Sequence, residues 1–274
     1  MPSSSADHAM VGDLVDLDRY PIANIASPEA VALVREGRRR LAADGVFTMP
    51  GFLHGDGLAA MEEEADRLCR EGFRRLDLRN AFPPGMGEET RVSLVCAGFD
   101  QMPSGSPPHR LFLWDGLTRF VSEVLERRPY YRNADAIASC MVSEYACGDE
   151  LGWHFDSNDG AVTIMLRQAG SGGAFEYIPD IRHRPDLASI IDDLVAGRSS
   201  RVRELDVLPG TLTIFNGLRA LHRVAPVRSA PSRRMLTLSY ETDPDQGFSD
   251  EIHMRYFGRR QPLTPVPSRG NATG

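Results

Sequence analysis

Two histidines and one aspartate carry the most informative chemistry in this chain. His154 and Asp156 are separated only by Phe155, and His222 lies far downstream. Two imidazoles and one carboxylate can bind one face of an octahedral metal ion and leave the other positions open, which is how non-heme iron(II) enzymes admit a co-substrate and oxygen. Alternate side chains of a strand point to the same side, so His154 and Asp156 should project together while Phe155 points into packing. The pattern predicts an iron site for oxidative chemistry.

The third ligand must come from a strand that is near in space and distant in sequence. His222 follows the run Thr211–Phe215, whose β-branched and aromatic residues predict a strand. This placement suits a barrel or a double-sheet jelly roll. A histidine, one residue and an acid occur by chance in many proteins, so the HxD pair alone is a weak signal.

Three further segments give the pair its context. Residues 145–153 lead into His154, residues 208–217 lead toward His222, and residues 172–179 lie between them. Taken in order, these segments resemble the iron(II)- and 2-oxoglutarate-dependent oxygenase family. Segments 173–179 and 236–240 resemble most the group that contains free amino acid hydroxylases and halogenases.

The resemblance implies a ligand set and a co-substrate site. His154, Asp156 and His222 would hold Fe(II), and 2-oxoglutarate and O2 would be the co-substrates. A basic residue about ten positions after the distal histidine pairs with the far carboxylate of 2-oxoglutarate in this family, and Arg233 and Arg234 both fit. Because neighbours on a strand face opposite sides, only one of the two can enter the site.

Arg233 is the arginine that we predict to bind 2-oxoglutarate. It shares parity with Thr237 and Ser239, whereas Arg234 alternates with apolar residues typical of outward packing: Leu236, Leu238 and Tyr240. The planar guanidinium fork suits bidentate binding of a carboxylate.

For the reaction, the resemblance implies decarboxylation of 2-oxoglutarate to succinate and CO2, coupled to oxidation of an unactivated C–H bond. A free amino acid or an amino-acid-derived metabolite is the expected substrate, in small-molecule biosynthesis. Related halogenases have a small residue in place of the carboxylate, so the retained Asp156 favours hydroxylation. Desaturation and ring closure stay open. Five charged residues near the expected pocket are candidate substrate contacts without an assigned role: Arg132, Glu144, Arg167, Glu176 and Arg219.

Two other classes of protein remain open. A non-catalytic, cupin-like metal-binding module could use the same three ligands, but it would not need a carboxylate-binding arginine. A zinc hydrolase could also use two histidines and an acid. It would need a general base, and the sequence has no HExxH-type helix.

The composition of the chain argues against some classes of binding partner. The net charge of −7 and the pI near 5.5 argue against a nucleic-acid partner. The chain has no apolar run of about eighteen residues and no signal-like N-terminus, so we expect no membrane partner and a cytoplasmic location. The spacing of Cys69, Cys96, Cys140 and Cys147 predicts reduced thiols. The oligomeric state is left open.

These patterns predict a single, mainly β domain with flanking helices, a double-stranded β-helix (jelly roll, cupin-like). We expect a disordered tail over residues 1–20, a helical part over 21–130, the jelly-roll catalytic core over 131–245 and a C-terminal extension over 246–274. The predicted helices span residues 28–44, 58–70, 111–127 and 186–196, with a short element at 252–257. The predicted strands span residues 46–49, 91–97, 136–145, 152–156, 161–167, 173–178, 203–207, 211–216 and 235–241.

Overall fold

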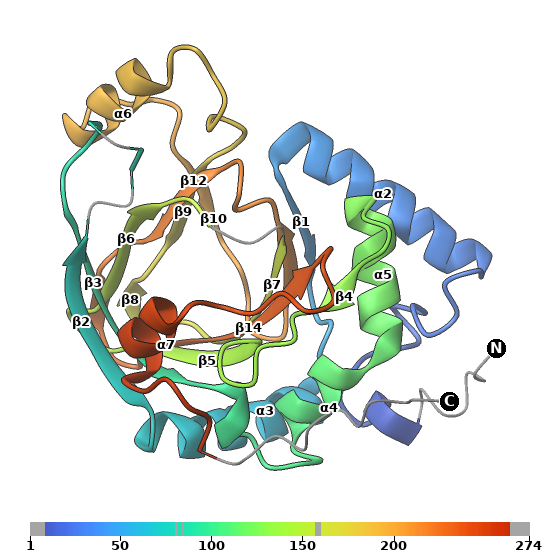
Figure 1. Cartoon of the computed structure of the whole chain (residues 1–274). Coiled ribbons are helices and arrows are strands. Elements are labelled where there is room, and N and C mark those ends of the chain that lie inside the picture. Colours follow the sequence, from blue (N-terminus) through green and yellow to red (C-terminus); the bar gives the residue numbers. More distant parts are fainter. Residues whose placement is uncertain (1–8, 80–81, 84, 157–159, 264–274) are drawn as a thin grey trace.

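A curled antiparallel sheet forms the centre of the protein, and helices cover its outside (Figure 1). The computed structural model describes residues 9–79, 82–83, 85–156 and 160–263. Twelve of the described strands form one sheet, along the path β1-β11-β7-β14-β5-β3-β6-β12-β9-β10, with β2 added on β3 and β4 on β14. Strands β8 and β13 form a separate pair. The architecture is mainly β with flanking helices, as predicted.

The elements have the following bounds. The strands are β1 (Val46–Met49), β2 (Phe73–Arg79), β3 (Thr90–Ala97), β4 (Tyr131–Arg132), β5 (Cys140–Tyr145), β6 (Glu150–His154), β7 (Gly160–Arg167), β8 (Ser171–Gly172), β9 (Phe175–Ile178), β10 (Arg203–Leu205), β11 (Leu212–Phe215), β12 (Leu221–Val224), β13 (Val227–Ser229) and β14 (Arg233–Glu241). The helices are α2 (Pro28–Asp44), α3 (Gly55–Arg70), α4 (Pro107–Leu113), α5 (Asp115–Leu125), α6 (Leu187–Val195) and α7 (Asp250–Phe257), with a short 3-10 turn η1 (Phe99–Gln101).

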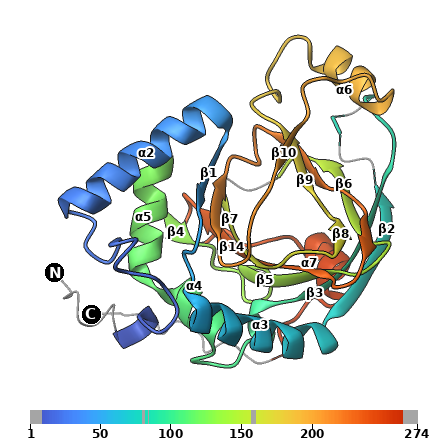
Figure 2. The same ribbon diagram turned by 180° about the vertical axis from the view of Figure 1, so that it is seen from behind.

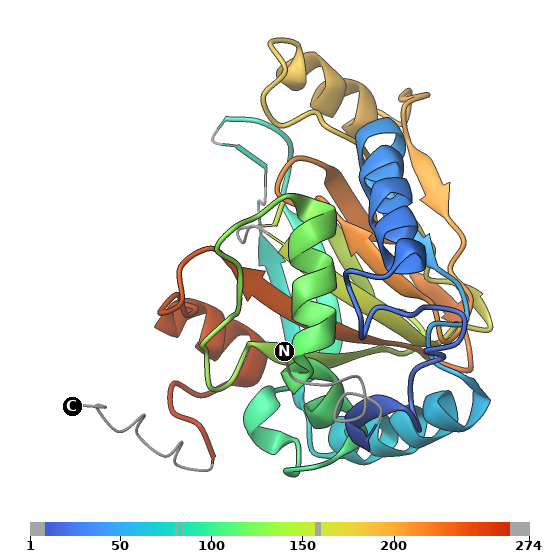
Figure 3. The ribbon, with the colours of Figure 1, turned by 90° about the vertical axis from the view of Figure 1, so that its right-hand side faces the viewer.

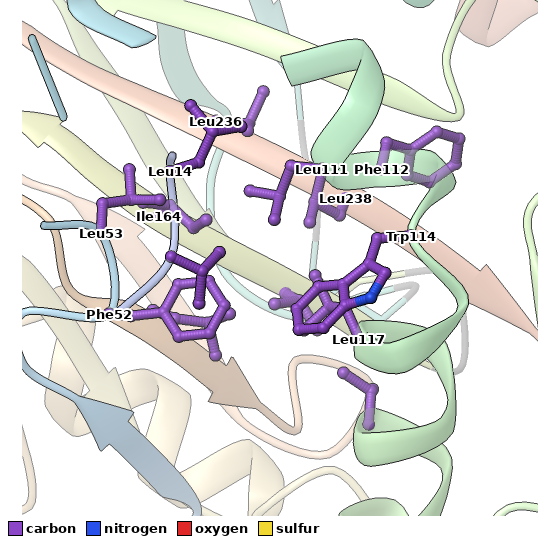
Figure 4. Packing of buried hydrophobic residues seen from close by; sticks show 14 of the residues in the cluster. Leu14, Phe52, Leu53, Leu111, Phe112, Trp114, Leu117, Ile164, Leu236 and Leu238 are labelled. Atoms are coloured by element: carbon purple, nitrogen blue, oxygen red, sulfur yellow. The ribbon is translucent and has the colours of Figure 1, made fainter. Parts of the chain in front are cut away.

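The main hydrophobic core lies between the outer face of the sheet and helices α2 to α5 (Figures 2 and 3). Leu236 and Leu238 of β14 and Ile164 of β7 point into this core, which also contains Phe52 and Trp114 (Figure 4). All five side chains are fully buried. The alternate residues of β14 therefore face the inside of the curled sheet, where the candidate site lies.

Two further helices lie at the rim. Helix α6 belongs to the connection between β9 and β10, and its apolar side packs with Trp153 and Ile178. Helix α7 packs on β2 and β3 (Figure 1). Among the helices within the described ranges, none is long and apolar enough to span a bilayer.

Part of the predicted N-terminal tail is packed. Val11, Leu14 and Val15 are at most 1% exposed, and the Tyr20 hydroxyl donates to the carbonyl of Pro50. The expectation of disorder up to residue 20 is therefore wrong for residues 9–20, since their apolar side chains complete the main core. Residues 1–8 lie outside the described residues.

The helix predicted over residues 111–127 is two helices, α4 and α5, which meet at Trp114. The backbone of Trp114 is extended, with φ −72° and ψ 114°, and its indole is fully buried. A Cβ at Gly116 would lie only 2.5 Å from that indole. Burial of the indole against the chain fixes the break, which helical periodicity does not reveal.

Candidate active site

The three predicted ligand residues lie together inside the curled sheet. His154 is the last residue of β6, and His222 is its direct partner on the antiparallel neighbour β12. Their ring centroids are 4.1 Å apart. The Oδ1 atom of Asp156 lies 3.7 Å from Nε2 of His154 and 3.5 Å from Nε2 of His222. One ligand atom from each residue falls within 4.8 Å of the others, which is a spacing that one metal ion can bridge.

Backbone carbonyls orient both imidazoles. Nδ1 of His154 lies 2.8 Å from the carbonyl of Gly152, and Nδ1 of His222 lies 3.0 Å from the carbonyl of Ala220. A carbonyl only accepts, so Nδ1 is the donor and Nε2 of each neutral ring keeps its lone pair. Such hydrogen bonds fix the tautomer of metal-binding histidines.

Asp156 reaches the cluster from a loop and not from a strand. We predicted a strand over residues 152–156, but β6 ends at His154. The backbone N–H of Asp156 donates to the carbonyl of Gly217 at 3.0 Å. A Cβ at Gly217 would lie 1.7 Å from Oδ2 of Asp156, so a glycine is needed for the carboxylate to sit where it does. The sequence analysis missed Gly217, because its only local signal is a glycine shortly before a predicted ligand.

The three residues line a cavity of about 160 Å³. Its wall is mostly apolar, with contributions from Leu94, Met141, Leu151, Met165, Phe175, Leu205, Val207, Phe215, Val224 and Met235. Its polar wall residues other than the three ligand residues and Arg233 are Ser143, Tyr145, Thr163, Thr213, Thr237 and Tyr256. Among the described wall residues, only Asp156 and Arg233 carry a formal charge when histidine is neutral.

Arg233 lies in this cavity wall and Arg234 does not. The Arg233 side chain is 1% exposed, and none of its three guanidinium nitrogens has a hydrogen-bond partner among the described residues. Burial lowers the pKa of Arg233 to about 10. Its guanidinium carbon lies 5.6 Å from the centre of the Tyr145 ring. A buried cation without a partner is costly, so the site is suited to an anion.

Arg234 points to the opposite side of β14 and is neutralised there. Its guanidinium lies 3.1 Å from Glu62, 2.7 Å from Asp66 and 3.1 Å from Glu144. The parity argument from the sequence therefore places the two arginines on the correct faces. What each arginine does is a separate question.

The five charged residues noted near the expected pocket are paired with other protein groups and do not line the cavity. The ion pairs are Arg132–Asp115 at 2.7 Å, Arg167–Glu144 at 3.0 Å, Arg223–Glu176 at 2.7 Å and Arg219–Asp180 at 2.5 Å. The four cysteines are free thiols, of which Cys147 alone is exposed.

The fold is that of the 2-oxoglutarate- and iron(II)-dependent oxygenases. An oxidoreductase of that family from Burkholderia pseudomallei has a TM-score of 0.53 and 17% identity, over 77% of this chain and 92% of its own. The carbocyclase SnoK from nogalamycin biosynthesis has a TM-score of 0.56 and 16% identity, over 85% and 93%. HygX from Streptomyces hygroscopicus, solved with nickel, 2-oxoglutarate and hygromycin B, has a TM-score of 0.54 and 15% identity, over 76% and 86%. The predicted jelly-roll fold is confirmed.

The sequence also matches the family model described as Halogenase D over residues 30–257, and the chain belongs to that family. None of the curated proteins matches it. Fold and family together confirm the class expected from the sequence, a 2-oxoglutarate-dependent non-heme iron enzyme.

Proposed function

We propose that the protein oxidises an unactivated C–H bond of a small molecule, with Fe(II), 2-oxoglutarate and O2, and releases succinate and CO2. His154, Asp156 and His222 hold the iron, and Arg233 binds the far carboxylate of 2-oxoglutarate. The observation that carries this proposal is the buried guanidinium of Arg233, which has no hydrogen-bond partner in the described part of the chain and lies in the cavity that also contains the ligand cluster. The metal alone would not account for such a cation, whereas a dicarboxylate bound beside the metal would.

The donor set fits iron(II). Two imidazole nitrogens and one carboxylate on one side of a cavity are the ligands of the non-heme iron(II) oxygenases. Iron held by these three residues would supply the activation of O2 and the binding of 2-oxoglutarate. The carbonyls of Gly152 and Ala220 hold the imidazole tautomers, and the carboxylate of Asp156 supplies negative charge between the two Nε2 atoms.

The wall of the cavity favours ion pairing at Arg233. Arg233 is 1% exposed and shares the cavity wall with apolar side chains such as Met165, Phe175 and Met235. An ion pair is stronger in such surroundings than in water, because the effective dielectric constant is lower. The protein thus supplies a buried positive charge for an anionic co-substrate and a ligand cluster for the metal.

Hydroxylation is the proposed outcome, although the family takes its name from a halogenase. Asp156 occupies the position that a small residue takes in the halogenases resembled by the sequence, and Gly217 leaves space for its carboxylate. Ring closure is the second candidate, because the structurally similar SnoK is a carbocyclase. Both outcomes begin with removal of a hydrogen atom from carbon.

A free amino acid or an amino-acid-derived metabolite is the proposed substrate. The described part of the cavity wall has no charge besides Asp156 and Arg233, so the reacting end of the substrate should be neutral and apolar. This favours an amino acid derivative whose apolar end enters the cavity. A role in small-molecule biosynthesis agrees with SnoK, which belongs to nogalamycin biosynthesis, and with HygX, whose structure contains hygromycin B.

The test is product mass. Protein purified without oxygen is given Fe(II), 2-oxoglutarate, O2 and single amino acids or their N-acylated forms. A product heavier by one oxygen atom supports hydroxylation, a product lighter by two hydrogens supports desaturation or ring closure, and chlorine incorporation from added chloride would overturn the argument from Asp156. His154→Ala and His222→Ala should abolish turnover and keep the fold. His109→Ala is the control, because His109 stacks on Phe99 outside the cavity.

A further inference from the structure

The two segments that carry the ligand residues meet at one arginine side chain. Asp156 follows β6, and Leu218 lies in the turn that leads to His222 on β12. Nη1 of Arg182 donates to the carbonyl oxygens of both Asp156 and Leu218, each at 3.0 Å. A single guanidinium nitrogen therefore joins the HxD loop to the loop of the distal histidine.

Arg182 is itself held in place. It belongs to the connection that follows β9 and carries α6. The backbone N–H groups of Ile181 and Arg182 donate to the carbonyl of Arg219, at 3.0 and 3.2 Å. The guanidinium carbon of Arg182 lies 5.2 Å from the centre of the ring of Phe155, the residue between His154 and Asp156. Three segments thus converge behind the ligand cluster.

The position of Asp156 explains why such a contact matters. Because β6 ends at His154, the ladder of the sheet does not fix the Asp156 carbonyl, and the carboxylate lies on a loop. A guanidinium is a rigid, permanently charged donor that can also stack on an aromatic ring. It is suited to hold two carbonyls at a fixed separation.

We infer that Arg182 is a positioning residue for the metal centre, through which the α6 connection sets the affinity of the site for its metal ion. The inference rests on the proposed function. Arg182 acts through the backbone of the ligand loops and not on the reacting atoms. Groups that orient metal ligands typically change metal affinity by about 10–100-fold when removed.

The experiment is a titration of the apoprotein with Co²⁺ alone, followed by the visible absorption of the bound ion. We expect the dissociation constant of Arg182→Met to rise by about 10–100-fold and that of Arg182→Lys to rise less, since lysine keeps one charged donor. Arg184→Met is the matched control, because Arg184 lies two residues away and pairs with Asp186 on the surface at 2.7 Å. Its dissociation constant should equal that of the wild type. The unfolding temperature of each apoprotein is measured in parallel.

The outcomes separate this inference from the proposed function. Wild-type Co²⁺ affinity in folded Arg182→Met, or a loss of the same size in Arg184→Met, would overturn the inference alone. If Arg182→Met does not fold, Arg182→Lys decides: weaker Co²⁺ binding at an unchanged apoprotein unfolding temperature supports the inference, and unchanged binding overturns it. Absence of Co²⁺ binding by the wild type would overturn the proposed function and the inference together.

Discussion

Arg233, as a buried cation without a hydrogen-bond partner among the described residues, should weaken the fold of the apoprotein. Burial lowers its pKa from 12.5 to about 10. A base with a folded pKa below its unfolded pKa disfavours folding wherever it is charged in both states, which includes neutral pH. At 1.36 kcal/mol per pKa unit, the cost is roughly 3 kcal/mol. Arg233→Met keeps much of the side-chain volume and removes the charge, so we expect the apoprotein to gain about 1–3 kcal/mol after some packing is lost.

Binding of 2-oxoglutarate should offset the stability advantage of Arg233→Met over the wild type. With Ni²⁺ in the site to prevent turnover, 2-oxoglutarate at a hundred times its dissociation constant should stabilise the wild type by about 2.7 kcal/mol. The same concentration should have little effect on Arg233→Met, because the far carboxylate has lost its partner. The variant is therefore expected to be the more stable protein without 2-oxoglutarate and to lose that advantage with it.

Urea unfolding followed by circular dichroism measures both quantities. Arg234→Met is the matched control on the opposite face of β14. It removes one cationic partner of Glu62, Asp66 and Glu144, which are partly exposed and keep Arg167 or Arg70 beside them, so it should destabilise the apoprotein and keep the response to 2-oxoglutarate. The reasoning is refuted if Arg233→Met is destabilised as Arg234→Met is, or if 2-oxoglutarate stabilises it as much as the wild type.

Three further predictions concern the loops and the core. Gly217→Ala places a Cβ 1.7 Å from Oδ2 of Asp156, so Co²⁺ binding should be lost while circular dichroism is unchanged; wild-type binding would contradict the account of the loop. Burial raises the pKa of Asp149, but hydrogen bonds that include one from Arg74 outweigh burial and leave it lowered. Its contribution to stability should thus be present above its ordinary pKa and lost below it, and Asp149→Asn should lose less stability than the wild type between neutral pH and about pH 3 in urea titrations. Leu236→Ala should lower the free energy of unfolding by about 2–5 kcal/mol, since the side chain is fully buried; a cost under about 1 kcal/mol would mean that the core is not packed as described.

Local sequence signals were sufficient to predict an element where residues at its own ends cap it. The Ser27 hydroxyl accepts from the N–H of Ala30 at the start of α2, and Gly45 ends the helix in the left-handed conformation with φ 75°. A capping residue, a proline in the first turn and a glycine are all visible in the sequence, so α2 and the following β1 were predicted with correct bounds.

Strand β2 shows why other elements were missed. Leu76 and Leu78 are 65% and 64% exposed, whereas Arg75, the residue directly before Leu76, is 1% exposed. Arg75 stacks on Tyr256 of α7, at 4.0 Å from the ring centre, and pairs with Asp77. A strand that buries its arginine and exposes its leucines reverses the usual pattern, and only the distant helix α7 explains it.

Some residues of the candidate site could likewise be predicted from the sequence, and others could not. Residue spacing and the family resemblance brought His154, Asp156 and His222 into view, and strand parity decided between Arg233 and Arg234. The roles of Gly217 and Arg182 depend on contacts between loops that are far apart in sequence. No periodicity or motif encodes such contacts, so they became visible only in the folded chain.

Succinate formation tests the central claim most directly. Wild-type protein with Fe(II), 2-oxoglutarate and O2 should release succinate, the release should require all three, and His222→Ala should release none. Wild-type protein that binds iron but forms no succinate, with or without any candidate substrate, would contradict the account and favour a metal-binding module without catalysis.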